Sequence, residues 1–171
     1  MQPLRIALTK GRLEKSTVQL FEQTGMDCSA LREKGRKLIL PVGDGSLQAV
    51  LAKAADVITY VEQGVCDMGV VGKDTIMENG SHFFESKAMD VRIIKIEGSV
   101  ELAPLLGLSD GIVDIVETGA TLRENGLEVV ERIHQVSARL IVNAASLKLR
   151  KGEIEDLAAR LEREIQKGEG K

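Results

Sequence analysis

The chain has 171 residues, of which 43% are hydrophobic and 29% charged, enough for one domain with a full core or for two small lobes. Its formal net charge is −3, and it has no tryptophan, one tyrosine and three phenylalanines. Nucleic-acid-binding proteins usually show a basic excess or aromatic stacking platforms, so this composition argues against them. Cys28 and Cys66 are too few for a disulfide framework or a zinc site, which fits a reduced, cytoplasmic protein.

The first half of the chain reads as alternating strands and short helices. The N-terminus enters a strand pattern directly, without the regions of a signal peptide, and no apolar run approaches a membrane span. Apolar periodicity predicts strands at residues 4–9, 36–42, 47–52 and 68–71. Helices are expected at residues 13–24, at 56–62 with Asp56 as N-cap, and at 75–78.

The second half continues the same alternation. Strands are predicted at residues 91–96, at 112–116, and as two adjacent strands within 129–142 that divide near Ser137. Helices are expected at residues 100–106 and 153–166. This order predicts an α/β fold whose ligands bind at the carboxyl ends of strands.

The segment Ile112–Leu127 is the most informative part of the sequence. The apolar run ends in Glu117-Thr118-Gly119-Ala120-Thr121, and helix-forming residues follow. Short residues at such a junction let backbone N–H groups converge on an anion, and the threonine hydroxyls add hydrogen bonds to phosphate oxygens. Asp114 and Glu117 are acceptor-only groups that suit sugar hydroxyls or a magnesium ion. The pattern favours a ribose 5-phosphate site; the alternative is a strand-to-helix turn that binds nothing.

Three further groups of polar residues lie at predicted strand ends. Lys10-Gly11-Arg12 follows the first strand, where a glycine permits close backbone approach and two cations suit phosphate; the alternative is two solvated surface cations. Arg36 could bring another guanidinium to the same place, or could guard an edge strand. Gly72-Lys73-Asp74 and Glu101 follow later strands, where Asp74 is foremost a candidate N-cap. No histidine or cysteine has the spacing of a metal site.

In this order, the motifs resemble the short-form ATP phosphoribosyltransferases, the catalytic subunits that open histidine biosynthesis. The resemblance runs from the first strand to the last helix. It rests on Leu-Thr-Lys-Gly-Arg (8–12), Gly-Arg-Lys-Leu (35–38), Ala-Asp-Val-Ile-Thr-Tyr-Val-Glu-Gln-Gly (55–64), Asp-Met-Gly-Val-Val-Gly-Lys-Asp (67–74), Gly-Ser-Val-Glu-Leu-Ala-Pro-Leu (98–105), Asp-Ile-Val-Glu-Thr-Gly-Ala-Thr-Leu (114–122) and Ser-Ala-Arg-Leu-Ile-Val-Asn (137–143).

The resemblance implies transfer of a phosphoribosyl group from phosphoribosyl pyrophosphate to N1 of ATP, with release of pyrophosphate and with Mg²⁺ present. It places the ribose 5-phosphate on Thr118, Gly119, Ala120 and Thr121, with Asp114 and Glu117 near the ribose hydroxyls. Arg12 and Arg36 match arginines that hold the ATP phosphates and the departing pyrophosphate. Lys10, Gly11, Lys73 and Glu101 are implied to line the same cleft, and no protein group is implied to bind the metal directly.

The implied fold is bilobed, like type II periplasmic binding proteins, and here its second lobe is truncated. Lobe I is expected to comprise residues 1–84 and 123–171, and a remnant of lobe II residues 85–122. Family members carry further strands between segments like residues 80–83 and 85–94, which abut in this sequence. If those strands are absent, weak or no catalysis is expected, and an impaired phosphate-binding remnant or scaffold subunit is the alternative function.

The resemblance also implies partners. Short-form subunits assemble with a regulatory subunit that resembles histidyl-tRNA synthetase, forming a hetero-octamer, and are homodimers alone. A small-anion binding module without chemistry is the competing interpretation, because the bilobed fold also resembles solute-binding proteins. The presence of Arg12 and Arg36 in addition to the predicted ribose 5-phosphate site favours the enzyme.

Overall fold

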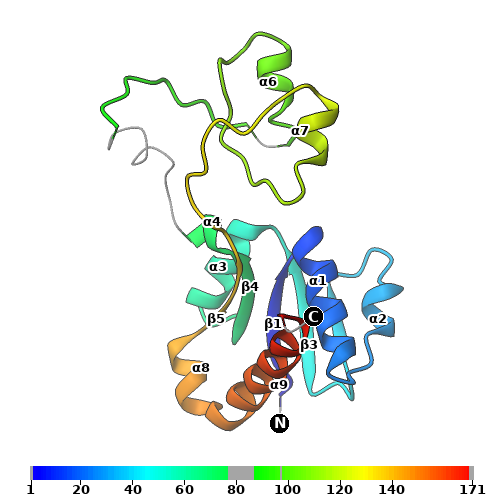
Figure 1. The fold of residues 1–171 in the computed structure, drawn as a ribbon. Coiled ribbons are helices and arrows are strands. Elements are labelled where there is room, and N and C mark those ends of the chain that lie inside the picture. Colours follow the sequence, from blue (N-terminus) through cyan, green and yellow to red (C-terminus); the bar gives the residue numbers. More distant parts are fainter. Residues whose placement is uncertain (1, 77–86, 97, 170–171) are drawn as a thin grey trace. The chain divides into compact units, whose positions relative to one another are not determined.

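The computed structural model describes residues 2–76, 87–96 and 98–169, and the chain divides into two compact units (Figure 1). Unit 1 comprises residues 1–77 and 137–171, and unit 2 comprises residues 78–136. The predicted junction at residues 80–86 and the end of the predicted helix at 75–78 lie outside the described residues.

A mixed sheet of five strands forms the centre of unit 1. Its strands are β1 (Leu4–Thr9), β2 (Ile39–Val42), β3 (Leu47–Ala52), β4 (Met68–Gly72) and β5 (Ala138–Val142), and their order is β2-β3-β1-β4-β5. β1 pairs in parallel with β3 on one side and with β4 on the other. The outer strands β2 and β5 pair antiparallel with β3 and β4. The carboxyl ends of β1, β3 and β4 therefore lie at the same edge of the sheet.

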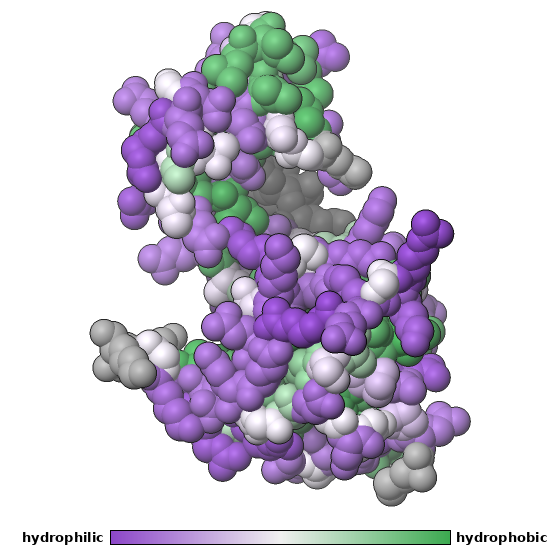
Figure 2. Space-filling model, turned by 90° about the vertical axis from the view of Figure 1, so that its right-hand side faces the viewer, coloured by the Kyte–Doolittle hydropathy of each residue, from purple (hydrophilic) through white to green (hydrophobic). Residues whose placement is uncertain are grey.

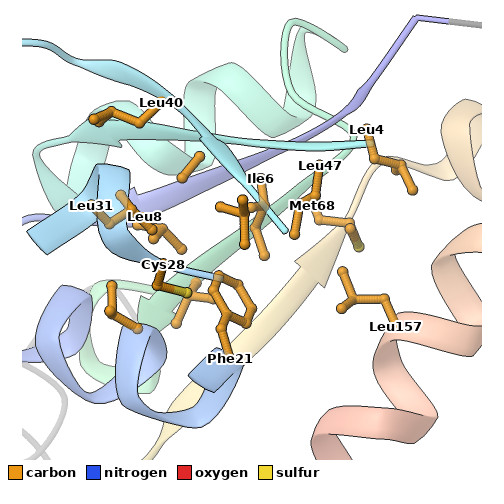
Figure 3. Close-up of a cluster of buried hydrophobic side chains, with 14 of the residues drawn as sticks. Leu4, Ile6, Leu8, Phe21, Cys28, Leu31, Leu40, Leu47, Met68 and Leu157 are labelled. Atoms are coloured by element: carbon orange, nitrogen blue, oxygen red, sulfur yellow. The ribbon is translucent and has the colours of Figure 1, made fainter. Parts of the chain in front are cut away.

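Helices cover both faces of this sheet. The described helices of unit 1 are α1 (Arg12–Gln23), α2 (Ser29–Arg32), α3 (Ala54–Glu62), α4 (Lys73–Ile76), α8 (Ala144–Leu149) and α9 (Lys151–Glu169). On one face, Ile6 and Leu8 of β1 pack with Phe21 of α1 and Leu157 of α9 (Figure 3). Ala7 points to the opposite face and packs in a second cluster with residues of α3. The three-layer α/β architecture follows from this alternation, because successive strand residues point to opposite faces.

Most predicted elements of unit 1 are confirmed. The strands at 4–9 and 47–52 have the predicted bounds, and the amphipathic C-terminal helix extends to Lys151–Glu169 as α9. The predicted N-cap role of Asp56 is wrong, because α3 begins at Ala54 with Lys53 as N-cap and Asp56 lies in its first turn. α8 was not predicted, although Asn143 is its N-cap and accepts hydrogen bonds from Ala145 N and Ser146 N.

Unit 2 departs further from the prediction. Its described residues form two short helices, α6 (Leu102–Leu105) and α7 (Ala120–Glu124), and no strand. The strands predicted at 91–96, 112–116 and 129–136 are therefore wrong; only β5, the second half of the 129–142 prediction, forms. The helix predicted at 100–106 is confirmed in a shorter form.

The apolar side chains of these three segments are exposed. Ile93 is 55% exposed, Val113 53% and Val130 93%. Figure 2 shows apolar side chains, in green, at the surface of unit 2. β-branched residues favour a pleated, half-buried surface, but a strand also needs a neighbour that takes up its backbone hydrogen bonds. These segments have the composition of strands, but none of them pairs with another strand among the described residues.

None of the described helices is long and apolar enough to cross a bilayer.

A close approach between β4 and α3 gives a test of the packing in unit 1. A Cβ on Gly69 would lie 2.7 Å from Val57 Cγ1 and 2.9 Å from Val61 Cγ2. We expect Gly69→Ala to lower the free energy of unfolding by about 1–3 kcal/mol, measured by urea denaturation, because both valines belong to the core. Gly152→Ala in α9, where a Cβ meets nothing within 4 Å, should instead be neutral or stabilise by up to about 1 kcal/mol. Equal stability of the two variants would contradict the close packing of α3 on β4.

Candidate functional site

The carboxyl edge of the unit 1 sheet is held together by hydrogen bonds between neighbouring strand ends. Lys10 N donates to Ala52 O at the end of β3, at 2.9 Å. Thr9 Oγ1 donates to Val70 O of β4, at 2.8 Å. Because β1 is bound on both sides where it ends, the loop that follows it starts from a fixed position.

Lys10 and Arg12 are exposed on this loop, on either side of Gly11. Gly11 is the N-cap of α1 and has φ 101° and ψ −130°, a conformation that L side chains rarely adopt. Gly11 O accepts a hydrogen bond from Lys15 N in the first helical turn. The glycine therefore permits the abrupt change from strand to helix that presents both cations at the edge of the sheet.

Arg36 lies in a turn, and its predicted place at the start of a strand is wrong. β2 begins only at Ile39, because residues 34–37 form a turn in which Lys37 N donates to Lys34 O at 3.0 Å and Gly35 has φ 55°. After the turn, Leu38 O accepts from Leu51 N of β3. Arg36 is exposed, and since β2 runs antiparallel to β3, it lies at the same edge of the sheet as the end of β3.

Gly72, Lys73 and Asp74 form the end of β4 and the start of α4. Lys73 N donates to Ser137 O at 2.9 Å, which ties this junction to the residue before β5. A Cβ on Gly72 would lie 2.1 Å from Asp74 Oδ1, so the carboxylate folds back over the glycine. Asp74 is the second residue of α4 and not its N-cap, which corrects the prediction.

The threonine-rich turn in unit 2 comprises residues 118–121. Gly119 is left-handed (φ 69°) and is the N-cap of α7, and Ala120 N donates to Thr118 Oγ1 at 3.3 Å. Arg123 Nη1 donates to Thr118 O at 3.1 Å. Thr118 and Thr121 are exposed. The loop and helix of the expected strand–loop–helix unit are confirmed, whereas the strand before them does not form.

The predicted carboxylates of unit 2 are near this turn in sequence or precede α6. Asp114 is exposed, and its Oδ1 accepts a hydrogen bond from Ile115 N at 2.7 Å; Glu117 is also exposed and directly precedes Thr118. Glu101 is the N-cap residue of α6, without a capping hydrogen bond from its side chain. The described residues hold no group of three or more His, Cys, Asp or Glu side chains that could bind a metal ion.

The two cysteines belong to the core. Both are buried, and burial raises the pKa of the Cys28 thiol to about 11 and also raises the pKa of the Cys66 thiol. A raised pKa leaves little thiolate at neutral pH, so neither cysteine is suited to act as a nucleophile.

Sequence reasoning missed one charged residue beside this site, Glu14. Its carboxylate is buried and pairs with Lys34 Nζ. A signal was available: Glu14 stands at helical spacing from Val18 and Phe21, so a carboxylate occupies the apolar stripe of α1. A charge in that position needs a partner.

Within each unit, the chemistry of the predicted residues is coherent. Unit 1 presents cations after neighbouring strand ends, which suits the binding of polyanions such as polyphosphates. Unit 2 presents backbone amides and hydroxyls in one turn, with two exposed carboxylates just before it, which suits a phosphate and a hydroxylated sugar.

Comparison with known proteins gives a consistent result. The family model described as ATP phosphoribosyltransferase matches two segments, residues 53–82 and 80–163. Relatives called ATP phosphoribosyltransferase from Bacillus cereus (strain G9842), Bacillus thuringiensis subsp. konkukian (strain 97-27) and Bacillus anthracis are 47% identical over 210 residues, covering 98% of this chain and 100% of each relative. The alignment spans 210 positions and this chain has 171 residues, so the relatives carry at least 39 residues without a counterpart here.

A solved structure is also similar. It is the ATP phosphoribosyl transferase (HisG:HisZ) complex from Thermotoga maritima, with a TM-score of 0.74 and 27% sequence identity, over 95% of this chain and 98% of the matched chain.

Proposed function

The chain belongs to the ATP phosphoribosyltransferase family, and from this premise we propose which of its residues bind the substrates and assist the reaction. The enzyme transfers the phosphoribosyl group of phosphoribosyl pyrophosphate to N1 of ATP, giving phosphoribosyl-ATP and pyrophosphate, the first step of histidine biosynthesis.

The turn of Thr118, Gly119, Ala120 and Thr121 is proposed to bind the 5-phosphate of the ribose. The observation that carries this assignment is the left-handed Gly119, which removes a side chain from the turn where exposed threonine hydroxyls and the first amides of α7 lie close together in sequence. Such amides and hydroxyls donate hydrogen bonds to phosphate oxygens without needing a basic side chain. Asp114 and Glu117 are exposed acceptors before the turn, which supports a role at the ribose hydroxyls.

The cations at the carboxyl edge of unit 1 are proposed to bind the phosphates of ATP and the departing pyrophosphate. Arg12 and Arg36 supply planar forks that match phosphate geometry, and Lys10 and Lys73 supply point charges. Gly11, between Lys10 and Arg12, has no side chain and open space beside it, which would let a phosphate approach the backbone closely. Glu101 is proposed to face the nucleotide, on the strength of the family motif alone.

The reaction requires alignment of the two substrates and stabilisation of the charge on the departing pyrophosphate more than it requires proton transfer. The bond from the anomeric carbon to pyrophosphate breaks as adenine N1 forms its bond to the same carbon, through an oxocarbenium-like state. N1 already carries a lone pair, so no general base is required. Guanidinium groups that bind pyrophosphate more strongly as it leaves would lower the barrier, which is the role proposed for Arg12 and Arg36.

Magnesium fits this scheme as an ion carried by the substrates. Mg²⁺ usually binds proteins through one or two carboxylates together with substrate phosphates, and the described residues hold no larger acidic cluster. Asp114 and Glu117 are exposed carboxylates just before the proposed sugar-phosphate turn in sequence. The ion would neutralise charge on the phosphates, while the protein supplies orientation.

We further propose that the chain has a bilobed fold like that of type II periplasmic binding proteins, with lobe II truncated. The two segments of the family match meet at residues 80–82, which supports a missing stretch at that point, and the relatives carry at least 39 residues in all without a counterpart here. The remnant of lobe II is proposed at residues 85–122, and lobe I at residues 1–84 and 123–171. Because unit 2 has no strand among its described residues, we expect turnover below that of full-length relatives.

The Thermotoga maritima structure is a complex of two kinds of subunit, which supports a regulatory partner for this chain. We propose a partner resembling histidyl-tRNA synthetase, a hetero-octamer with it, a homodimer without it, and a cytoplasmic location.

The phosphate turn can be tested by removing one hydroxyl. Thr121→Ala should weaken binding of phosphoribosyl pyrophosphate by roughly 1–3 kcal/mol, because a hydrogen bond to a charged group is lost. Isothermal titration calorimetry measures this, with Thr59→Ala on α3 as the matched control, since Thr59 Oγ1 donates to Ala55 O of its own helix. Unchanged affinity of Thr121→Ala would remove this residue from the site.

The leaving-group role predicts a kinetic signature for Arg36. Arg36→Gln should lower kcat at least about tenfold while KM for phosphoribosyl pyrophosphate changes little, because the contact strengthens as pyrophosphate departs. Pyrophosphate release from phosphoribosyl pyrophosphate and ATP is the assay. An effect confined to KM would place Arg36 in ground-state binding only.

Truncation can be tested by restoring the missing stretch. Grafting the corresponding segment of the Bacillus cereus relative at residues 80–82 should raise turnover and should protect amides of residues 91–96 and 112–116 from hydrogen exchange, because these segments would gain strand partners. A matched insertion of glycine and serine residues should do neither. If both insertions leave turnover and exchange unchanged, the lost segment is not what limits unit 2.

A further inference from the structure

We propose that Glu14 is a positioning residue: its ion pair with Lys34 holds the turn that carries Arg36 against the start of α1, which carries Arg12. This inference rests on the proposed function of the two arginines. It assigns to Glu14 no contact with substrate.

The burial of the pair is the first observation. Only 8% of the Glu14 side chain is exposed, whereas Lys34 is 39% exposed, and Lys34 Nζ donates to Glu14 Oε1 across 20 residues of sequence. Glu14 lies on the face of α1 that also buries Val18 and Phe21. A carboxylate costs free energy when it leaves water, and a paired ammonium offsets that cost. Separation of Lys34 from Glu14 is therefore unfavourable, which makes the contact a firm anchor for the loop.

The position of Lys34 in its loop is the second observation. Lys34 is the first residue of the turn closed by Lys37 N and Lys34 O, and Arg36 is the third. The far end of the turn is fixed to the sheet, because Leu51 N of β3 donates to Leu38 O. Glu14 thus fixes the near end, and the turn is held on both sides of Arg36. With Lys34 released, the anchor on the near side would move back along the chain to α2, whose Leu31 packs in the core and whose Arg32 pairs with Glu22.

The place of Glu14 in α1 links this anchor to the other arginine. Arg12 is the first residue of α1 and Glu14 the third, in the helical turn that starts from Gly11. A helical turn is rigid compared with a loop, so the carboxylate has a fixed position relative to the backbone of Arg12. One carboxylate therefore sets the separation between the two backbone segments that carry Arg12 and Arg36.

The chain offers a matched control in another ion pair of α1, which joins Glu22 of α1 to Arg32 of α2. Arg32 Nη2 lies 2.7 Å from Glu22 Oε2, and its hydrogen bonds hold the pKa of Glu22 below the ordinary value. The two side chains are 51% and 38% exposed, and the pair lies at the other end of α1 from Arg12. Exposed pairs of this kind contribute little to stability or to geometry.

The experiment compares Glu14→Gln with Glu22→Gln in the full chain. Glu14→Gln should lower kcat for pyrophosphate release about tenfold with little change in KM for phosphoribosyl pyrophosphate, because a displaced catalytic group costs rate more than binding. Amide hydrogen exchange over residues 33–38 should accelerate in the same variant. Glu22→Gln should change neither. Lys34→Met removes the same ion pair from the loop side. If circular dichroism shows that Glu14→Gln does not fold, kcat and amide exchange are measured on Lys34→Met instead.

Coupling to Arg36 separates positioning from a general structural effect. In the double variant Glu14→Gln/Arg36→Gln, kcat should fall no further than in Arg36→Gln alone, because Glu14 acts through that arginine. Multiplicative losses in the double variant would overturn the proposal, and so would equal turnover and equal exchange in Glu14→Gln and Glu22→Gln. If the unaltered chain releases no pyrophosphate, the residual turnover proposed for it fails. Faster exchange of residues 33–38 in Glu14→Gln and Lys34→Met then still supports the anchor, and unchanged exchange overturns it.

Discussion

Parallel pairing of β1 with β3 and β4 is the constraint on which the arrangement of unit 1 depends. It brings three strand ends to one edge, and Lys10 N and Thr9 Oγ1 bind the neighbouring ends there. The loops that leave this edge carry Lys10, Arg12 and Lys73. The antiparallel β2 adds Arg36 to the same edge because its amino end lies beside the carboxyl end of β3. A cationic edge thus follows from strand direction, without a basic excess in the whole chain.

The sheet also explains which residues belong to the core and which lie in the loops at its edge. Alternate residues of β1 are committed to the two apolar layers, with Ile6 and Leu8 on one face and Ala7 on the other. The polar side chains proposed to bind substrates in unit 1 lie in the loops where the strands end. Glu14 differs from them, since it lies on the buried stripe of α1 and is paired with Lys34. Burial of this carboxylate costs free energy, and its proposed role is to fix a loop that the reaction needs in one place.

The sequence predicts a helix or strand correctly where its local pattern agrees with the packing of the folded chain. The bounds of β1 and β3 follow from apolar runs that end at turn residues, and α9 follows from Ile154, Leu157 and Leu161 at helical spacing. The cationic loops after the strands were predicted in the same way. Arg36 was misplaced because its turn depends on Gly35 and on a hydrogen bond between Lys37 and Lys34, which a strand-like composition conceals. The strands of unit 2 failed for a different reason: residues such as Val113 and Val130 have strand propensity, but pairing depends on other segments of the chain.

The assignment of the sugar phosphate to the threonine-rich turn is the claim on which the proposed chemistry of this chain depends most. A crystal structure of the protein with phosphoribosyl pyrophosphate and Mg²⁺ tests it directly. The account predicts density for the 5-phosphate within hydrogen-bond distance of the Gly119–Thr121 amides and the threonine hydroxyls. Density for the sugar phosphate elsewhere, with this turn empty, would contradict it.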